Sequence, residues 1–210
     1  MLTRRPTHPL RKDKSGVAMT EFALTLPIFL IALTGGIELT NLALVHLRLN
    51  HVAETAADNA SRVRTQMDEN DIAEMFAGIE LEGKPINLKD KGRLILSSVQ
   101  DNGKTGNAKG QTIRWQRCHG GKTAKAPKYG VEGKGKADNA LKDGLGPPGR
   151  RIQAQPGTAV MFVEVAYDYE PMVFDMLIQP REIRYESAFN VRERTELGIT
   201  NVKGKPVKNC

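Results

Sequence analysis

Hydrophobic and polar positions divide the N-terminal part of the chain into two helical patterns. Residues 17–37 form a run of twenty-one residues with a single formal charge, Glu21. As an α-helix this run is about 31 Å long at ~1.5 Å per residue, which is enough to span the hydrocarbon core of a bilayer. Beyond Glu38 the apolar residues recur every three or four positions, as in an amphipathic helix. This apolar stripe consists of Leu42, Val45, Leu49, Val52, Ala56, Ala60 and Val63.

The two patterns predict one continuous helix over roughly residues 17–66, because no proline or glycine follows Gly36 in this region. Two features weaken that helix. Pro27 lacks a backbone donor and frees the carbonyl of Ala23, which predicts a kink. Gly35 and Gly36 lower the helix propensity near the end of the apolar run.

Further along the chain the period changes from helical to extended. Asp71 is in position to cap a short helix over residues 72–81. The segments LILSSV (94–99) and TIRWQRC (112–118) flank a turn-rich stretch, DNGKTGNAKG. They predict a hairpin with a long loop.

Two later segments alternate between apolar and polar residues. Within 158–169 the apolar face carries Met161, Val163, Val165, Tyr167 and Tyr169, and within 182–194 it carries Ile183, Tyr185, Phe189 and Val191. Alternation of this kind is typical of half-buried antiparallel strands. A four-stranded sheet with one apolar face needs a cover, which the amphipathic half of the long helix can supply. The sequence therefore predicts an α+β fold, with a long N-terminal helix packed on a small antiparallel sheet.

The formal net charge of +7 is unevenly distributed along the chain. The first sixteen residues contribute +4, from Arg4, Arg5, Arg11, Lys12 and Lys14 against Asp13, and the rest contributes +3. A basic flank before an apolar run predicts a cytoplasmic N-terminus and an exported C-terminal part. Because the excess charge is mostly N-terminal, it argues against nucleic acid as a partner. A secretory signal peptide is disfavoured by the length of the run and by the lack of a small-x-small cleavage site.

A Gly- and Lys-rich stretch at residues 119–151 carries eight Lys or Arg against three acidic residues. It could present a surface to an anionic polymer such as DNA, polysaccharide or lipid headgroups. The alternative is a long solvated loop between strands, which we favour because Tyr129 is its only aromatic residue and cannot form a base-stacking platform alone.

The sequence offers no pattern of catalytic or metal-binding residues. The four histidines are His8, His46, His51 and His119, and they do not form a metal-ligand pattern with Cys118. No Ser-His-Asp or GxSxG arrangement is present. We therefore expect no catalytic site, no metal and no cofactor, and we predict that the protein is not an enzyme.

The N-terminal segment resembles a known family. Residues 11–60 contain a basic leader, the motif GVAMTEFAL beginning at Gly16, an LP pair at Pro27 and a GGIE sequence at the end of the apolar run. Together they resemble the TadE-type (TadE/TadG-like) pseudopilins of the tight-adherence (Tad/Flp) pilus system. The segments MFVEVAYDYEP and SAFNVRERTEL resemble the C-terminal part of that family more loosely.

The resemblance implies a type IV pilin-like plan with a processed N-terminus. A prepilin peptidase would cut after Gly16, remove the leader 1–16 and leave Val17 as the new N-terminus, with Glu21 as the fifth residue and the aromatic Phe22 after it. Glu21 would then pair with an N-terminal amine, of its own chain or of a neighbour. A glutamate that merely snorkels to the interface or protonates is the alternative.

The same resemblance implies a domain layout and a location. Residues 17–37 would span the bacterial inner membrane, residues 38–66 would continue the helix outside it, and residues 67–210 would form a periplasmic α+β domain. The implied function is that of a minor pilin or pseudopilin in pilus assembly, with or without incorporation into the filament. Its partners would be prepilin peptidase, other pilin or pseudopilin subunits, inner-membrane assembly proteins and membrane lipid. An uncleaved bitopic anchor, whose periplasmic domain scaffolds a secretion complex or binds an anionic polymer, is the alternative.

The two cysteines are Cys118 and Cys210. A periplasmic location would permit a disulfide between them. Closing a loop of about ninety residues would stabilise the fold by roughly 4–5 kcal/mol on the chain-entropy account. A free or intermolecular thiol at Cys210 is the alternative that the sequence leaves open.

Overall fold

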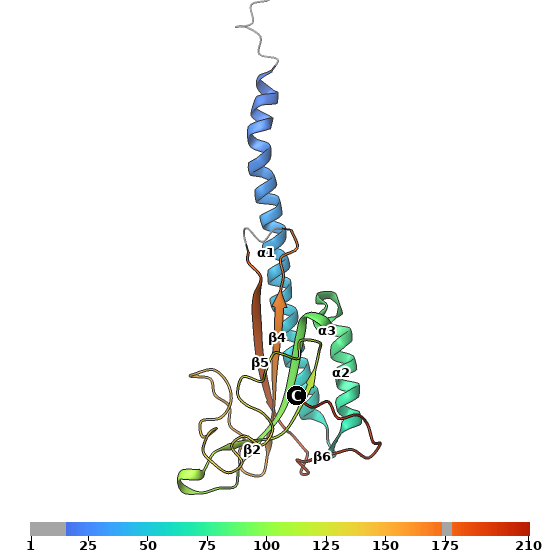
Figure 1. Cartoon of the computed structure of the whole chain (residues 1–210), viewed down its shortest axis with the longest axis vertical. Coiled ribbons are helices and arrows are strands. Elements are labelled where there is room, and N and C mark those ends of the chain that lie inside the picture. Colours follow the sequence, from blue (N-terminus) through green and yellow to red (C-terminus); the bar gives the residue numbers. More distant parts are fainter. Residues whose placement is uncertain (1–15, 174–177) are drawn as a thin grey trace, which may run out of the picture.

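One long helix and an antiparallel sheet dominate the computed structural model, which describes residues 16–173 and 178–210. Helix α1 (Val17–Arg62) runs without interruption through its 46 residues. Its first half projects from the domain and its second half lies along the sheet (Figure 1). The helix ends four residues earlier than the sequence pattern predicts, because Val63 leaves the helical region with a ψ of 119°.

The main sheet confirms the predicted α+β fold. It consists of β2 (Gly92–Asp101), β3 (Gln111–His119), β4 (Ala159–Tyr169) and β5 (Arg181–Asn190). All neighbours are antiparallel, and the strand order is β3-β2-β4-β5. The predicted hairpin is the β2–β3 pair, whose register shifts between Ser98 and Val99.

Shorter elements complete the domain. Strand β1 (Met67–Asp68) pairs in parallel with β6 (Ile199–Thr200). Helix α2 (Glu69–Gly83) follows, and then come η2 (Lys84–Ile86), α3 (Leu88–Lys91) and, after β2, η3 (Gly106–Ala108).

The N-terminal cap of α2 differs from the prediction. Asp68 is the N-cap residue, and its side chain accepts a hydrogen bond from the backbone N–H of Asn70 at 2.9 Å. Asp71 lies one turn inside the helix and accepts from the N–H of Asp68 at 2.9 Å. The two aspartates therefore form a capping box that satisfies two donors at once, so the helix begins three residues earlier than Asp71 alone predicts.

The main core lies between α1 and one face of the sheet. The predicted apolar stripe of α1 contributes Val45, Leu49, Val52, Ala56 and Ala60, all buried, while Leu42 and Val63 are partly buried beside them. The predicted inward residues of β4 and β5 belong to the same cluster. The alternating pattern of these strands was therefore interpreted correctly for this face.

The opposite face of the sheet is also covered, contrary to the expectation of a single apolar face. Leu141, Leu145 and Ala154, from the segment between β3 and β4, pack on Ile113 and Phe162. Val99 and Val160 complete this second cluster. Strand β4 is buried on both faces, so the Gly- and Lys-rich stretch is partly a packed layer rather than a solvated loop.

The C-terminal tail is fastened to the sheet at β3. A disulfide joins Cys118 of β3 to Cys210, 92 residues further along the chain. The backbone N–H of Cys118 donates to the carbonyl oxygen of Lys208 at 2.8 Å, and Nη2 of Arg93 donates to the carbonyl oxygen of Cys210 at 2.8 Å. The tail thus lies against the edge strand through covalent and polar contacts.

Candidate membrane and assembly site

The predicted processing signal lies at the start of α1. Gly16 is the N-cap residue, and its carbonyl oxygen accepts from the N–H of Thr20 at 3.2 Å. Val17, Glu21 and Phe22 are exposed. Val17 and Glu21 are four residues apart, so they lie one above the other on the same side of the helix. Residues 1–15 of the predicted leader lie outside the described residues.

The first half of α1 is apolar and bare. Its most apolar stretch of 18 residues has a mean hydropathy of 1.9, and only 6% of that stretch is buried in the fold. By length and composition the helix can cross a bilayer. This is compatible with a single-pass membrane protein. Pro27 lies inside the continuous helix, and the kink expected there stays a prediction.

A second apolar stripe continues outward beyond the predicted membrane segment. Leu33, Ile37, Leu44 and Leu47 lie at steps of four, seven and three on the same side of the helix and are exposed. Leu47 is 67% exposed, although Leu49, which points to the opposite side of the helix, is completely buried. Helix α1 therefore has one apolar stripe that holds its own sheet and another that is free to contact something else.

The sequence analysis missed the role of Glu38. This residue is only 2% exposed, and its carboxylate accepts from the backbone N–H of Met172 at 2.9 Å and of Val173 at 3.1 Å. The hydroxyl of Tyr169 also donates to it. Burial alone would raise the pKa of Glu38, but these hydrogen bonds outweigh it and lower the pKa below its ordinary value. The carboxylate thus ties the β4–β5 connection to α1.

No local pattern identifies this arrangement, because the donors lie more than 130 residues further along the chain. The only signal in the sequence is the position of a carboxylate directly after an apolar run. Such a charge needs a partner when it is buried.

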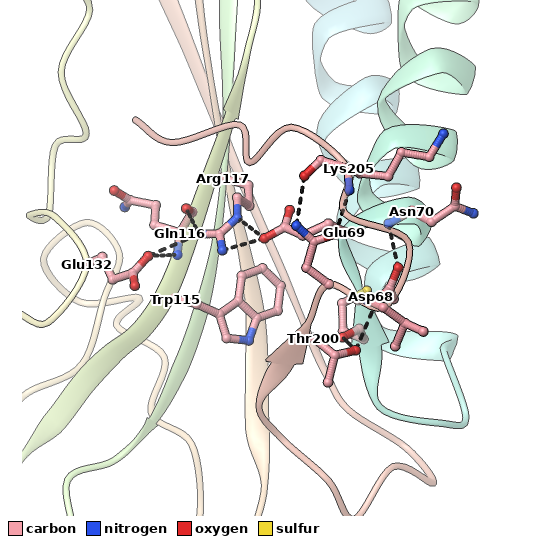
Figure 2. Close-up of polar contacts among 12 residues, drawn as sticks. Asp68, Glu69, Asn70, Trp115, Gln116, Arg117, Glu132, Thr200 and Lys205 are labelled. Atoms are coloured by element: carbon pink, nitrogen blue, oxygen red, sulfur yellow. Dashed lines mark hydrogen bonds and ion pairs between the residues drawn. The ribbon is translucent and has the colours of Figure 1, made fainter.

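A buried ion pair connects α2 to the sheet on the other side of the domain (Figure 2). The Nε of Arg117, on β3, donates to Oε1 of Glu69 at 2.7 Å, and both side chains are buried. Nη1 of the same arginine donates to Oε2 of Glu132 at 3.1 Å. Because both acids occupy its donors, we assign Arg117 a structural role.

Some basic residues of the Gly- and Lys-rich stretch pair with acids on the sheet. Lys125 lies 2.6 Å from a carboxylate oxygen of Asp168 and also pairs with Glu182. Lys128 pairs with Glu186 at 3.1 Å. These pairs lower the positive potential that this stretch presents to an anionic polymer.

The predicted histidines are also separated in space. His46 hydrogen-bonds the hydroxyl of Tyr185, whereas His51 contacts Glu82 and His119 pairs with Glu80. Among residues 16–173 and 178–210, no group of three or more His, Cys, Asp or Glu side chains could hold a metal ion.

Comparison with protein families identifies the segment that contains the processing signal and the bare helix. The family model described as TadE-like protein matches residues 16–58. This segment is TadE-like. The match contains Gly16, Val17, Glu21 and Phe22, and it confirms the predicted resemblance over nearly all of α1. Neither curated proteins nor solved structures gave a match to the chain.

The match over residues 16–58 suggests involvement in the tight-adherence pilus system. TadE-like pilus proteins are structural components, and the expectation that this chain is not an enzyme stays a prediction. The looser C-terminal resemblance lies outside the matched residues and also stays a prediction.

Proposed function

We propose that this TadE-like protein is a minor pilin or pseudopilin that prepilin peptidase processes and that takes part in assembly of a tight-adherence pilus. One observation carries the proposal. The matched segment places Gly16, Val17, Glu21 and Phe22 at the exposed start of a helix that is bare in its first half and packed on its own domain in the second.

In this proposal the bare helix has two successive environments. Before assembly, residues 17–37 lie in the inner membrane, with the leader in the cytoplasm and the sheet domain in the periplasm. During assembly the same apolar surface packs against helices of other pilin subunits. The exposed stripe that includes Leu44 and Leu47 extends this surface beyond the membrane. Burying apolar side chains between subunits then favours association.

Glu21 would determine the axial position of the chain in such an assembly. Cleavage after Gly16 converts the amide nitrogen of Val17 into an α-amino cation. In an apolar environment this cation and the Glu21 carboxylate stabilise each other, because isolated charges there are costly. A pair between neighbouring chains fixes one register, as buried polar pairs do in coiled coils.

Intact mass and N-terminal sequencing of the membrane protein test this proposal. We expect a chain that starts at Val17 in cells with prepilin peptidase and an uncut chain in cells without it. A Gly16→Ala variant should remain uncut in both. If the wild-type chain is uncut in both strains, processing is excluded and the protein is a permanent bitopic anchor with a periplasmic scaffolding domain.

A further inference from the structure

We infer that Met172 and Val173 form a second contact with the lipid bilayer, at the boundary between headgroups and acyl chains beside the point where α1 leaves it. The inference rests on the proposed membrane placement of α1. It adds a binding surface on the sheet domain that the family match does not cover, because that match ends at residue 58.

The position of the β4–β5 connection points to the membrane. Strands β4 and β5 reach α1 at the end of the sheet that faces the bare half of the helix (Figure 1). Met172 lines a shallow groove together with Leu33, Gly36, Ile37 and Leu44 of α1. Leu33 and Ile37 belong to the predicted membrane span, so Met172 lies at the depth where that span ends.

Two of the exposed side chains in the described part of this connection, Met172 and Val173, are apolar. Met172 is 70% exposed and Val173 is 38% exposed. The apolar surface of Met172 adjoins that of Leu33 and Ile37 in the groove, so these side chains form one continuous patch. An exposed apolar patch that continues a membrane-spanning surface fits the same lipid phase.

Glu38 holds these side chains at a fixed depth. Its carboxylate accepts from the backbone N–H groups of Met172 and Val173, and it directly follows Ile37, the last residue of the predicted span. The hydrogen bonds also satisfy two backbone donors that lipid could not satisfy. The connection can therefore enter the interface without unpaired amides at these positions.

Lipid fits this patch better than a protein partner does. The groove is lined mostly by apolar side chains and backbone, with few polar groups to specify a protein surface. The flexible, polarizable side chain of Met172 suits contact with fluid acyl chains. With α1, the contact would limit the tilt of the domain relative to the bilayer.

Tryptophan quenching in liposomes tests the inference with the full-length chain. Met172→Trp, Phe29→Trp and Val202→Trp are each reconstituted into phosphatidylcholine that is brominated in the upper part of one acyl chain. Wild type supplies the background signal of Trp115, the only native tryptophan. Val202 is the matched control, because it is exposed and follows β6 at the far end of the domain (Figure 1).

We expect the Met172→Trp variant to show blue-shifted emission and a loss of fluorescence in brominated lipid, close to that of Phe29→Trp, while Val202→Trp is unchanged. Glu38→Gln in the Met172→Trp background should reduce the quenching. If only Phe29→Trp is quenched, the inference is wrong and the membrane placement of α1 stands. If Phe29→Trp is not quenched either, both the inferred lipid contact of Met172 and the proposed membrane placement of α1 are wrong. A blue shift without quenching would indicate a protein contact and would also overturn the inference.

Discussion

Three glutamates of this chain, Glu21, Glu38 and Glu164, lie in three different environments, and the environment determines the role of each carboxyl group. Glu21 is exposed on a bare apolar helix, Glu38 is buried among hydrogen-bond donors, and Glu164 is buried beside another carboxylate. The energetic difference between these positions comes from solvation and partners, since the side chain is the same.

Replacing Glu21 tests whether it sets the axial register between neighbouring chains in the assembly. Under the proposed function, Glu21→Gln keeps the size and helix propensity of the side chain but removes the charge that would pair with the amine of Val17. We expect normal cleavage and membrane insertion with a loss of surface pili in electron micrographs. Glu54→Gln, on the exposed side of the same helix outside the span, is the control and should retain piliation. Wild-type numbers of pili on the Glu21→Gln strain would contradict the proposed pairing.

Glu164 should make the stability of the domain depend on pH in an unusual direction. Burial raises the pKa of Glu164 to about 7, assisted by Glu186 on the neighbouring strand and opposed by the backbone N–H of Lys128. The folded state therefore binds this proton more tightly than the unfolded state does. The stability that protonated Glu164 contributes to the folded state is complete below the ordinary glutamate pKa. It is lost as the pH rises through about 7.

Unfolding in urea, followed by the fluorescence of buried Trp115, measures this effect in the full-length protein in mild detergent. Relative to wild type, Glu164→Gln should gain stability between pH 5 and pH 8, with an upper limit on the order of 3 kcal/mol. Glu193→Gln, an exposed control, should follow wild type across this range. Parallel curves for wild type and Glu164→Gln would show that Glu164 is ionised throughout.

At the scale of elements, helix α1 has two apolar stripes. One packs on the sheet of its own domain, and the other is exposed and, under the proposed function, contacts other subunits. Leu49 is completely buried against the sheet, whereas Leu47 is 67% exposed on the free stripe. The two residues have the same side chain and are two positions apart, which makes them a matched pair.

Leu49→Ala should lower the free energy of unfolding by about 2–5 kcal/mol, because it removes buried contacts and leaves a cavity. Leu47→Ala should change it by less than about 0.5 kcal/mol, as is typical of exposed sites. Urea unfolding distinguishes the two. Under the proposed function, Leu47→Ala should nevertheless reduce piliation, since it removes part of the surface between subunits. Full piliation in that variant would exclude Leu47 from the interface.

At the scale of the whole molecule, the Cys118–Cys210 disulfide joins the C-terminal tail to an edge strand. Cys210→Ser should lower the free energy of unfolding by about 4–5 kcal/mol, because the unfolded chain regains the freedom of a large open loop. A reducing agent should lower the free energy of unfolding of the wild type by the same amount and should leave that of the variant unchanged. A wild-type protein whose thiols react with an alkylating agent directly after isolation would show that the bond does not form in the cell.

The sequence by itself determined the features that depend on periodicity. The apolar run, the stripe from Leu42 to Val63 and the alternation in β4 and β5 were all sufficient to predict a long helix on an antiparallel sheet. Such patterns succeed because an element must turn its apolar side toward the core wherever its neighbours lie. The TadE-like resemblance was likewise visible in one contiguous segment, residues 16–58.

Only the tertiary structure decided which groups distant in the chain meet. Glu38 accepts from backbone amides at Met172 and Val173, and Arg117 pairs with Glu69. The cover on the second face of the sheet, from Leu141 and its neighbours, has no regular period to predict it. The physical reason is common to all three cases. A buried charge or an apolar face requires a partner, but the sequence fixes only the requirement, and the path of the folded chain supplies the partner.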